Sequence, residues 1–426
     1  MVKLNSKLNE IGIKAKESAF EFLKFESSSR NRSLLNISEQ LLDRKNEIID
    51  VNNCDVDNAI SSGLSSSLIG RMQLDESKIQ KISEDMIKIS ELKESVGVRF
   101  DQKILTNGLK VSKVRVPIGV IGVIYESRPN VTVDISAICI KSSNAVILRG
   151  GSDAFNSNLL LSEIIRDSIS LAGLPQDVIQ FVSDTDREIV NGMLSMDQYI
   201  DLMIPRGGAE LIRYVSDKAT MPSITGGIGV CHIYIDSISD ISMGVSIVDN
   251  AKTSNPYVCN AVDTVILHCD IAHVFLNMLL DKLINKNVIF KCDPDAIEIV
   301  QQNHGIGSNI LEAEQTDWGK EFLGLTLAIK VVNSFESAIS HIQNFGSGHS
   351  ECIITSIPEN GDRFLREVDA SAVFLNSSTR FNDGSELGLG AEVAVSTNKI
   401  HARGPMGPDE LTSYKWIIEG DGQIRE

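Results

Sequence analysis

The chain has 426 residues, a length that allows two or three domains. Its 42% hydrophobic and 23% charged residues are ordinary for globular proteins, which excludes a disordered chain, a collagen-like chain and a coiled coil. Because 57 acidic residues outnumber 40 basic ones, the net charge of −17 argues against a general nucleic-acid binder, and a small anionic substrate would need a local basic pocket.

The sequence does not predict a membrane protein, a secreted protein or a metal-binding protein. No apolar run approaches the roughly 20 residues of a membrane span, since the run from Ile118 to Tyr125 has the length of a strand. Residues 1–20 lack the apolar core of a secretory signal. The 7 scattered cysteines, an odd number, indicate reduced thiols and a cytoplasmic location. Without a C-x-x-C or H-E-x-x-H pattern, no metal site is predicted.

The first hundred residues are helical in pattern, and a β-hairpin follows them. Apolar residues recur at helical spacing at Leu4, Leu8 and Ile11, and again at Ile79, Ile82, Met86 and Ile89. Between residues 103 and 114, Asn107-Gly108 supplies the left-handed conformations of a tight turn between β-rich flanks.

Alternating strands and helices then predict a first parallel sheet. The expected strands are Gly119–Ile124, Ala145–Leu148, Val178–Val182 and Ile200–Ile204, and the expected helices are Pro129–Lys141, residues 152–171, Ile189–Leu194 and residues 208–215. Runs of this kind form parallel sheets covered by helices, with ligands at the carboxyl ends of the strands. Two double glycines, Gly150-Gly151 and Gly207-Gly208, occupy such ends.

A second α/β pattern begins near Gly226. Its expected strands are Cys231–Ile235, Thr264–Leu267, Val288–Phe290, Leu327–Val332, Glu351–Thr355 and Ala372–Leu375. A last strand is expected around Trp416. The sequence therefore predicts an α/β protein with two doubly wound parallel-sheet domains and a small β arm.

Cys259, in Asn255-Pro-Tyr-Val-Cys-Asn, is a candidate thiolate nucleophile. We expect its loop to enter a helix, whose dipole lowers a thiol pKa. The alternative is a buried cysteine that acts only as a small hydrophobe.

The double glycines are candidates for phosphate binding. Each follows a buried strand, precedes a helix and lies beside an arginine, Arg149 or Arg206, that is able to pair with a phosphate. The alternative is turn chemistry alone, because neither place carries the G-x-G-x-x-G pattern.

For several other polar residues, the sequence allows either a functional or a purely structural role. Asn130 follows Arg128-Pro129 at the end of a strand, and its amide is either an oxyanion donor or part of a helix cap. The cations Lys252, Arg380 and Arg403 form either a basic pocket or ordinary surface charge. For the stretch from His341 to Glu351, histidines bonded to neighbours are favoured over a metal site.

Taken together, these segments resemble the aldehyde dehydrogenase superfamily and, within it, the gamma-glutamyl phosphate reductases, also called glutamate-5-semialdehyde dehydrogenases. The similar segments cover nearly the whole chain in order: 116–132, 250–260, 341–351, 388–397 and 401–407. One departure is Phe345, where that family usually has His or Tyr, and it predicts altered local hydrogen bonding without loss of activity.

The resemblance implies a role for each matching residue. Cys259 falls at the nucleophile and Asn130 at the oxyanion-stabilising amide. Arg149 lies where the cofactor's adenosine ribose or 2′-phosphate is bound, which suits NADP, and it is followed by Gly150 and Gly151. Arg206-Gly207-Gly208 occupies the pyrophosphate turn, and Glu321 matches the residue that binds the nicotinamide ribose. Substrate-binding roles are expected for Lys252, Asn255, Arg380 and Arg403.

The reaction that the resemblance implies is the NADPH-dependent reduction of L-glutamyl 5-phosphate to L-glutamate 5-semialdehyde in proline biosynthesis, through a cysteine thioester. Hydrolytic relatives carry a Glu before two glycines to activate water, whereas the stretch Thr225–Val230 has no carboxylate there. An acylating enzyme that uses coenzyme A or another acyl phosphate, and a non-catalytic relative, are the alternatives. Only Arg149 distinguishes NADP from NAD.

The resemblance also implies how the chain is organised. An NADP-binding domain takes residues 1–102 and 117–228, a catalytic domain takes 229–378, and an oligomerisation arm with the C-terminal segment takes 103–116 and 396–426. A homo-oligomer is expected, either dimer or tetramer. Because acyl phosphates hydrolyse quickly, direct transfer of the substrate from a glutamate 5-kinase is a further hypothesis. A fused kinase domain is not expected within these 426 residues.

Overall fold

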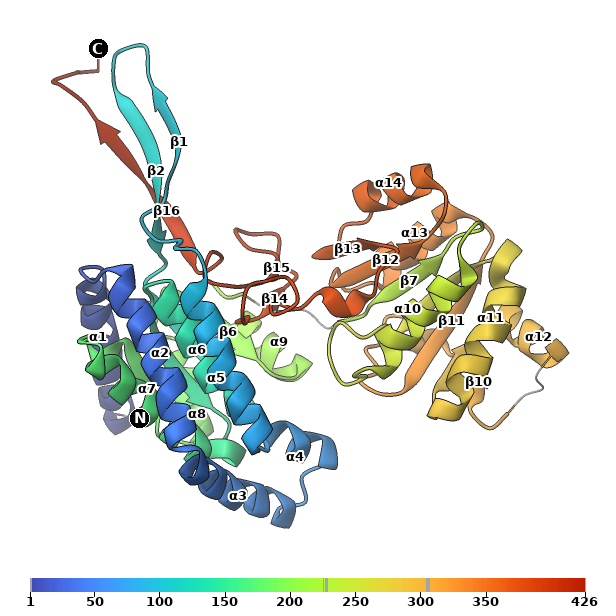
Figure 1. Cartoon of the computed structure of the whole chain (residues 1–426), viewed down its shortest axis with the longest axis horizontal. Coiled ribbons are helices and arrows are strands. Elements are labelled where there is room, and N and C mark those ends of the chain that lie inside the picture. The colour runs from blue at the N-terminus through green and yellow to red at the C-terminus, as the bar shows by residue number, and fades with distance from the viewer. Residues whose placement is uncertain (1, 225, 227–228, 304–306, 426) are drawn as a thin grey trace. The chain divides into compact units, whose positions relative to one another are not determined.

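The chain folds into two compact units, each described here by itself (Figure 1). The computed structural model describes residues 2–224, 226, 229–303 and 307–425. The first unit comprises Met1–Gly226, Gly388–Ala394 and Pro405–Glu426, and the second comprises Gly227–Leu387 and Val395–Gly404. The predicted C-terminal segment 396–426 is thus divided between the two units at Gly404.

Five helices open the first unit, as their apolar spacing predicts. They are α1 (Val2–Phe22), α2 (Ser27–Asp43), α3 (Lys45–Ser61), α4 (Ser66–Met72) and α5 (Glu76–Glu91). The apolar side chains of α5 at Ile79, Ile82, Met86 and Ile89 are all buried. Helix α5 is capped by the preceding Asp75, whose carboxylate accepts from the Lys78 N–H at 2.8 Å.

A four-stranded parallel sheet forms the core of the first unit, with the order β5-β4-β3-β6. The strands are β3 (Val120–Tyr125), β4 (Ala145–Gly150), β5 (Ile179–Phe181) and β6 (Leu202–Arg206). They alternate with α6 (Asn130–Lys141), α7 (Phe155–Leu171), α8 (Arg187–Met193) and α9 (Ala209–Lys218), and with 3-10 turns at Ser152–Ala154 and Gln176–Val178. In register, Tyr125 pairs with both Gly150 and Arg206, so β3, β4 and β6 end at one level of the sheet.

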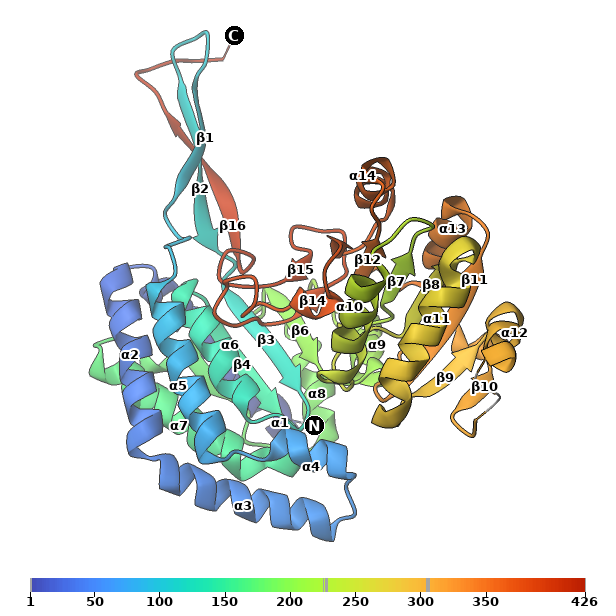
Figure 2. The ribbon, with the colours of Figure 1, turned by 45° about the vertical axis from the view of Figure 1, so that its right-hand side comes forward.

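The arm is a three-stranded antiparallel sheet built from distant segments. It consists of β1 (Arg99–Ile104), β2 (Lys110–Pro117) and β16 (Thr412–Glu419), in the order β1-β2-β16. The turn lies where it is predicted, and Gly108 has a left-handed φ of +85°, whereas Asn107 does not adopt the predicted left-handed conformation. Instead, Asn107 Oδ1 accepts from the Leu109 N–H at 3.2 Å. Both views show these strands extending away from the helices of the same unit (Figures 1 and 2).

A seven-stranded parallel sheet forms the second unit, with the order β10-β9-β11-β8-β7-β12-β13. The strands are β7 (His232–Ile235), β8 (Thr264–His268), β9 (Ile289–Cys292), β10 (Ile310–Glu312), β11 (Thr326–Val332), β12 (Ser350–Ile354) and β13 (Ala372–Leu375). Strand β10 is an edge strand that the sequence pattern did not predict. The strands β14 (Val395–Ser396) and β15 (Gly404–Pro405) form a separate pair.

Helices cover both faces of this second sheet. The helices are α10 (Ile241–Thr253), α11 (Cys269–Leu283), α12 (Pro294–Asn303), α13 (Phe335–Phe345) and α14 (Pro358–Glu367), with 3-10 turns at Ile284–Lys286, Gln315–Asp317 and Thr379–Phe381. One apolar cluster gathers side chains of α10, α11 and α12, and another gathers those of α13 and α14. The α/β prediction with two parallel-sheet bodies and a β arm is confirmed. In the part of the chain that the structure describes, no helix has both the length and the apolar character to cross a membrane.

A buried amide joins the arm to the first sheet, and we expect its loss to destabilise the unit. Asn144 Oδ1 accepts from the Gly119 N–H at 2.8 Å, and its Nδ2 donates to the Leu411 carbonyl at 2.9 Å. Since Asn144→Ala leaves both backbone groups without these bonds, it should cost about 2–4 kcal/mol in the free energy of unfolding. Urea denaturation measures this loss. Asn53→Ala, at an exposed position on α3, is the control and should stay within about 0.5 kcal/mol of wild type.

Candidate active site

Cys259 lies in a loop that connects a helix to a strand. Helix α10 ends at Thr253, and the chain passes through Cys259 before it enters β8 at Thr264. The prediction that this loop enters a helix is therefore wrong, and the loop itself offers no helix N-terminus to the thiol. The Cys259 side chain is partly exposed, and no disulfide joins any of the seven cysteines. The alternative of a fully buried, inert cysteine does not describe this position.

Arg380 is bonded to the cysteine loop on both sides of Cys259. Its Nε donates to Ser254 Oγ at 3.3 Å, and its Nη1 donates to Asn260 Oδ1. The Asn260 amide donates in turn to the Arg380 carbonyl at 3.3 Å, and Thr379 Oγ1 donates to the Asn260 carbonyl at 2.7 Å. The structure thus brings Arg380 against the loop that carries the candidate nucleophile.

Lys252 and Asp263 form a buried ion pair beneath the same loop. The Lys252 ammonium lies 3.5 Å from Asp263 Oδ1 and donates to the Gly324 carbonyl at 3.3 Å. Burial lowers the pKa of Lys252 and raises the pKa of Asp263. Because Asp263 also accepts from the Phe322 N–H at 3.1 Å, the pair ties α10 and β8 to the segment that carries Glu321.

Glu321 is joined to the backbone beside Cys259. Its Oε1 accepts from the Gly229 N–H at 3.1 Å. A Cβ placed on Gly229 would lie only 2.0 Å from the Cys259 carbonyl oxygen, so the two backbones are in direct contact. The second unit therefore gathers Cys259, Glu321, Lys252 and Arg380.

Two other predicted substrate residues have local partners. Asn255, exposed, accepts from the Tyr257 N–H at 3.3 Å in a turn before Cys259. Arg403 is bonded to Asp369, donating to that residue's carboxylate and, at 3.1 Å, to its carbonyl. Lys399 pairs with the same carboxylate. Their substrate-binding roles stay predictions.

The histidines near Glu351 form a buried cluster. His232 Nδ1 lies 2.9 Å from Glu351 Oε2, and the His232 and His341 ring centroids are 5.5 Å apart. Burial lowers the pKa of His341 to about 3 and raises the pKa of Glu351. The Phe345 ring packs against His341 with the ring centroids 4.8 Å apart and the planes tilted by 44°.

Asn130 is the first residue of α6, at the carboxyl end of β3. Its Nδ2 donates to Asp134 Oδ2 at 2.8 Å, one helical turn further on. Burial raises the pKa of Asp134 to about 7, although the bond from Asn130 acts in the opposite direction. The amide of Asn130 is therefore oriented by a carboxyl group that is partly protonated at neutral pH.

Arg149 and its two glycines lie at the carboxyl end of β4. The Arg149 Nη2 donates to the Thr185 carbonyl at 3.1 Å, while its buried Nε has no hydrogen-bond partner among the described residues. A Cβ on Gly150 would lie 2.3 Å from Asn158 Nδ2, and one on Gly151 would lie 3.2 Å from the Ser127 nitrogen. Both positions thus favour glycine on steric grounds.

The turn Arg206-Gly207-Gly208 precedes helix α9 and already binds a carboxylate. Glu126 Oε2 accepts from the Gly208 N–H at 2.7 Å, and a Cβ on Gly207 would lie 2.3 Å from the same oxygen. The N–H of this turn therefore faces an anionic oxygen, as expected for a phosphate-binding turn.

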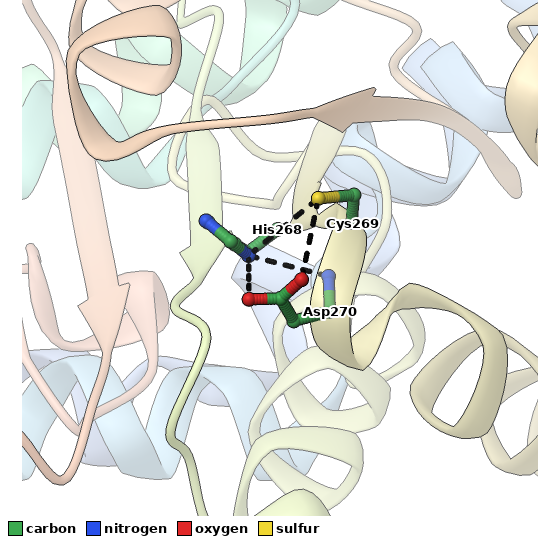
Figure 3. A group of neighbouring side chains, drawn as sticks. All are labelled: His268, Cys269 and Asp270. Carbon is green, nitrogen blue, oxygen red and sulfur yellow. Dashed lines mark hydrogen bonds and ion pairs between the residues drawn. The ribbon is translucent and has the colours of Figure 1, made fainter.

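A separate group of possible metal ligands lies at the start of α11 (Figure 3). The nitrogen, sulfur and oxygen donors of His268, Cys269 and Asp270 are all within 4.8 Å of one another. His268 Nδ1, however, accepts from the Asp270 N–H at 3.3 Å and so caps the helix. Cys269 and Asp270 are exposed, and the positive end of a helix dipole disfavours a cation. We therefore assign this group to helix capping.

Sequence reasoning missed three polar residues of these sites: Glu126, Cys231 and Asp263. Glu126 follows an apolar strand, and Asp263 stands directly before a strand whose centre is Val-Ile-Leu. A single carboxylate that borders such a strand is a usable signal, because a buried charge needs a partner. Cys231 carries no comparable signal. The stretch Thr225–Val230 lies partly outside the described residues, at Thr225, Gly227 and Ile228.

Comparison with known proteins finds a matching family, similar sequences and similar solved structures. The model of the aldehyde dehydrogenase family matches residues 5–296. A gamma-glutamyl phosphate reductase of Dehalococcoides mccartyi is 47% identical over 94% of each chain. One of Chloroflexus aggregans is 47% identical over 98% of this chain and 99% of the relative. The crystal structure of gamma-glutamyl phosphate reductase from Thermotoga maritima superposes with a TM-score of 0.94 at 39% identity, covering 98% of this chain and 100% of the other.

The raised pKa of Asp134 predicts a specific pH dependence of stability. A carboxyl whose pKa is higher in the folded chain contributes fully below about pH 4, and this contribution is lost as the pH rises through about 7. The stability of Asp134→Asn relative to wild type should therefore increase by on the order of 1–2 kcal/mol from pH 5 to pH 8. Chemical denaturation at the two pH values measures this gain. Asp217→Asn, at an exposed position on α9, is the control, and an equal gain there would contradict the assignment.

Proposed function

Because the chain belongs to the gamma-glutamyl phosphate reductases of the aldehyde dehydrogenase family, we propose that it reduces L-glutamyl 5-phosphate to L-glutamate 5-semialdehyde and phosphate in proline biosynthesis. The observation that carries this proposal is 47% identity along 94% of the chain to a relative of that name.

Cys259 is the proposed nucleophile. Its thiolate attacks the γ-carbonyl carbon of the acyl phosphate, a carbon–sulfur bond forms, and the bond to the phosphate oxygen breaks as phosphate leaves. Phosphate is a good leaving group, so this step needs little acid assistance. The partly exposed loop position is consistent with a thiol that substrate reaches.

Charge on the carbonyl oxygen needs hydrogen-bond donors. We assign this role to the Cys259 backbone N–H and, from the family resemblance, to the Asn130 amide. Asp134 accepts from one N–H of that amide, which leaves the second N–H for the oxyanion.

The substrate's anionic groups need cations in an acidic protein. We assign the main role to Arg380, because its guanidinium is bonded to Ser254 and Asn260 on either side of Cys259. Lys252 is fully buried on Asp263, so we assign it to support of the loop. Asn255 and Arg403 stay secondary candidates.

A nicotinamide cofactor fits the residues at the strand ends of the first unit. The Gly208 N–H already binds an anionic oxygen, and Arg149 keeps an unpaired buried Nε among the described residues. We propose that Arg206, Gly207 and Gly208 bind the pyrophosphate, that Arg149 with Gly150 and Gly151 selects NADP, and that Glu321 binds the nicotinamide ribose. When bound, the reduced nicotinamide supplies the hydride that converts the thioester to the aldehyde level.

We further propose that the chain forms a homo-oligomer and receives its substrate directly from another enzyme. The arm of β1, β2 and β16 exposes Tyr414, Trp416 and Ile418, which suits pairing with another copy of the chain. A glutamate 5-kinase that passes the labile acyl phosphate directly is the proposed supplier.

Removal of the thiol tests the covalent mechanism. Cys259→Ala should lower the rate of phosphate-dependent NADP⁺ reduction by glutamate semialdehyde about 10³-fold or more, because no thioester forms. The assay follows absorbance of the reduced cofactor. Cys269→Ala, an exposed thiol of the same unit, should keep the wild-type rate. A normal rate in Cys259→Ala would show that the cysteine is not the nucleophile.

Loss of the Arg149 guanidinium tests the cofactor assignment. Arg149→Ser should raise the KM for NADP⁺ by roughly 10–100-fold, as expected for one charge-assisted phosphate contact, and leave the KM for NAD⁺ nearly unchanged. Steady-state kinetics with both cofactors measures the ratio. Arg32→Ser, at an exposed position on α2, is the control. If the KM for NADP⁺ and the KM for NAD⁺ rose equally, Arg149 would not bind the 2′-phosphate.

A further inference from the structure

The peptide carbonyl of Cys259 accepts a hydrogen bond from a second, fully buried cysteine. Cys231, directly before β7, places its Sγ 3.1 Å from the Cys259 carbonyl oxygen. The same sulfur lies 3.5 Å from the Gly229 carbonyl oxygen and 3.8 Å from His349 Nδ1. A thiol has one proton, and the shortest of the three contacts is the one to Cys259.

The surroundings of Cys231 keep its thiol protonated. Burial raises the pKa of Cys231 well above its ordinary value, and the nearby carboxylates of Asp263 and Glu351 act in the same direction. The S–H group is therefore a hydrogen-bond donor, not a second nucleophile. Its bond to the carbonyl is a stable feature of the neutral-pH protein.

The backbone of Gly229 restricts Cys259 from the same segment. A Cβ on Gly229 would lie 2.0 Å from the Cys259 carbonyl oxygen and 2.7 Å from its Cα. The Gly229 N–H is bonded to Glu321. The short segment from Gly229 to Cys231 therefore contacts both the Cα and the carbonyl of the nucleophile.

Polar contacts continue from Cys231 to the residue after the nucleophile. His349 Nδ1 lies 2.8 Å from Ser350 Oγ, which accepts from Asn382 Nδ2 at 2.8 Å. The Asn382 carbonyl accepts from Asn260 Nδ2 at 3.1 Å. Burial lowers the pKa of His349 to about 4, so its ring is neutral. Because Ser350 Oγ accepts from Asn382, its O–H is able to donate to His349 Nδ1, which leaves the thiol proton to the Cys259 carbonyl.

We propose that Cys231 is a positioning residue for the reaction: its thiol holds the Cys259 peptide carbonyl and thereby fixes the direction in which the nucleophilic sulfur points. The inference rests on the proposed function, because it takes Cys259 as the nucleophile. A nucleophile held in one orientation needs less reorganisation to reach the attack geometry, so the effect falls on turnover and not on binding.

Replacement of the donor tests this role. Cys231→Ala removes the S–H group, Cys231→Val removes it while filling its volume, and Cys231→Ser restores a donor. We expect kcat of phosphate-dependent semialdehyde oxidation to fall about ten-fold in the Ala and Val variants, with both KM values within about two-fold, and to recover to within about three-fold in the Ser variant. Cys292→Ala, equally buried in β9 of the same unit, should lower the melting temperature without lowering kcat.

Three outcomes would overturn the proposal. A wild-type kcat in Cys231→Ala or Cys231→Val would leave the thiol only a packing role. A Ser variant as slow as the Ala variant would show that the donor is not what matters. An equal loss of kcat in Cys292→Ala would assign the effect to a loosened core.

A readout without substrate separates this inference from the proposed function. Alkylation of Cys259 by iodoacetamide, followed by mass spectrometry, should be about three-fold slower in Cys231→Ala and unchanged in Cys231→Ser, because a sulfur that is not held in one direction reaches the attack geometry less often. If wild type showed no semialdehyde activity, the proposed function would fail and this rate would still decide the role of Cys231. Equal alkylation rates in wild type and Cys231→Ala would overturn that role.

Discussion

The second unit depends on the buried ion pair between Lys252 and Asp263. Two charges removed from water are costly, and they persist only where close partners compensate them. Here Lys252 also donates to the Gly324 carbonyl, and Asp263 also accepts from the Phe322 N–H. One pair thereby connects the helix before the cysteine loop, the strand after it and the segment that carries Glu321. The geometry around Cys259 follows from this connection.

Around that pair, the cysteine loop is held by groups from distant parts of the chain. Arg380 and Thr379 bind the Asn260 side, and Gly229 and Cys231 contact Cys259 itself. Each contact is weak by itself, and together they leave the loop few alternative conformations. The proposed nucleophile is therefore held by backbone contacts and buried donors, without a helix N-terminus at its own loop.

In the first unit, residues from different segments are brought together because the ends of its parallel strands are aligned. Since Tyr125 is in register with Gly150 and Arg206, the residues after three strands meet at one edge. Glycine at positions 150 and 207 lets the backbone approach its neighbours, and Glu126 shows that the turn before α9 binds an anionic oxygen. This edge is where we propose that the anionic cofactor binds.

The sequence by itself determined the α/β class, the helical first hundred residues and the Asn107-Gly108 turn. It also determined the strand that carries Arg149 and the strand that follows Cys259. These features depend on local periodicity and on turn residues, which a single stretch of chain records. It did not determine the edge strand β10, the hydrogen bond from Asn130 to Asp134, or the position of Cys259 between a helix and a strand. From the sequence, Lys252 was either a cation of a basic pocket or a surface charge, and no role was predicted for Cys231. Only tertiary structure decided these points, because burial and partners come from residues far away in the sequence, such as Asp263 for Lys252 and Cys231 for Cys259.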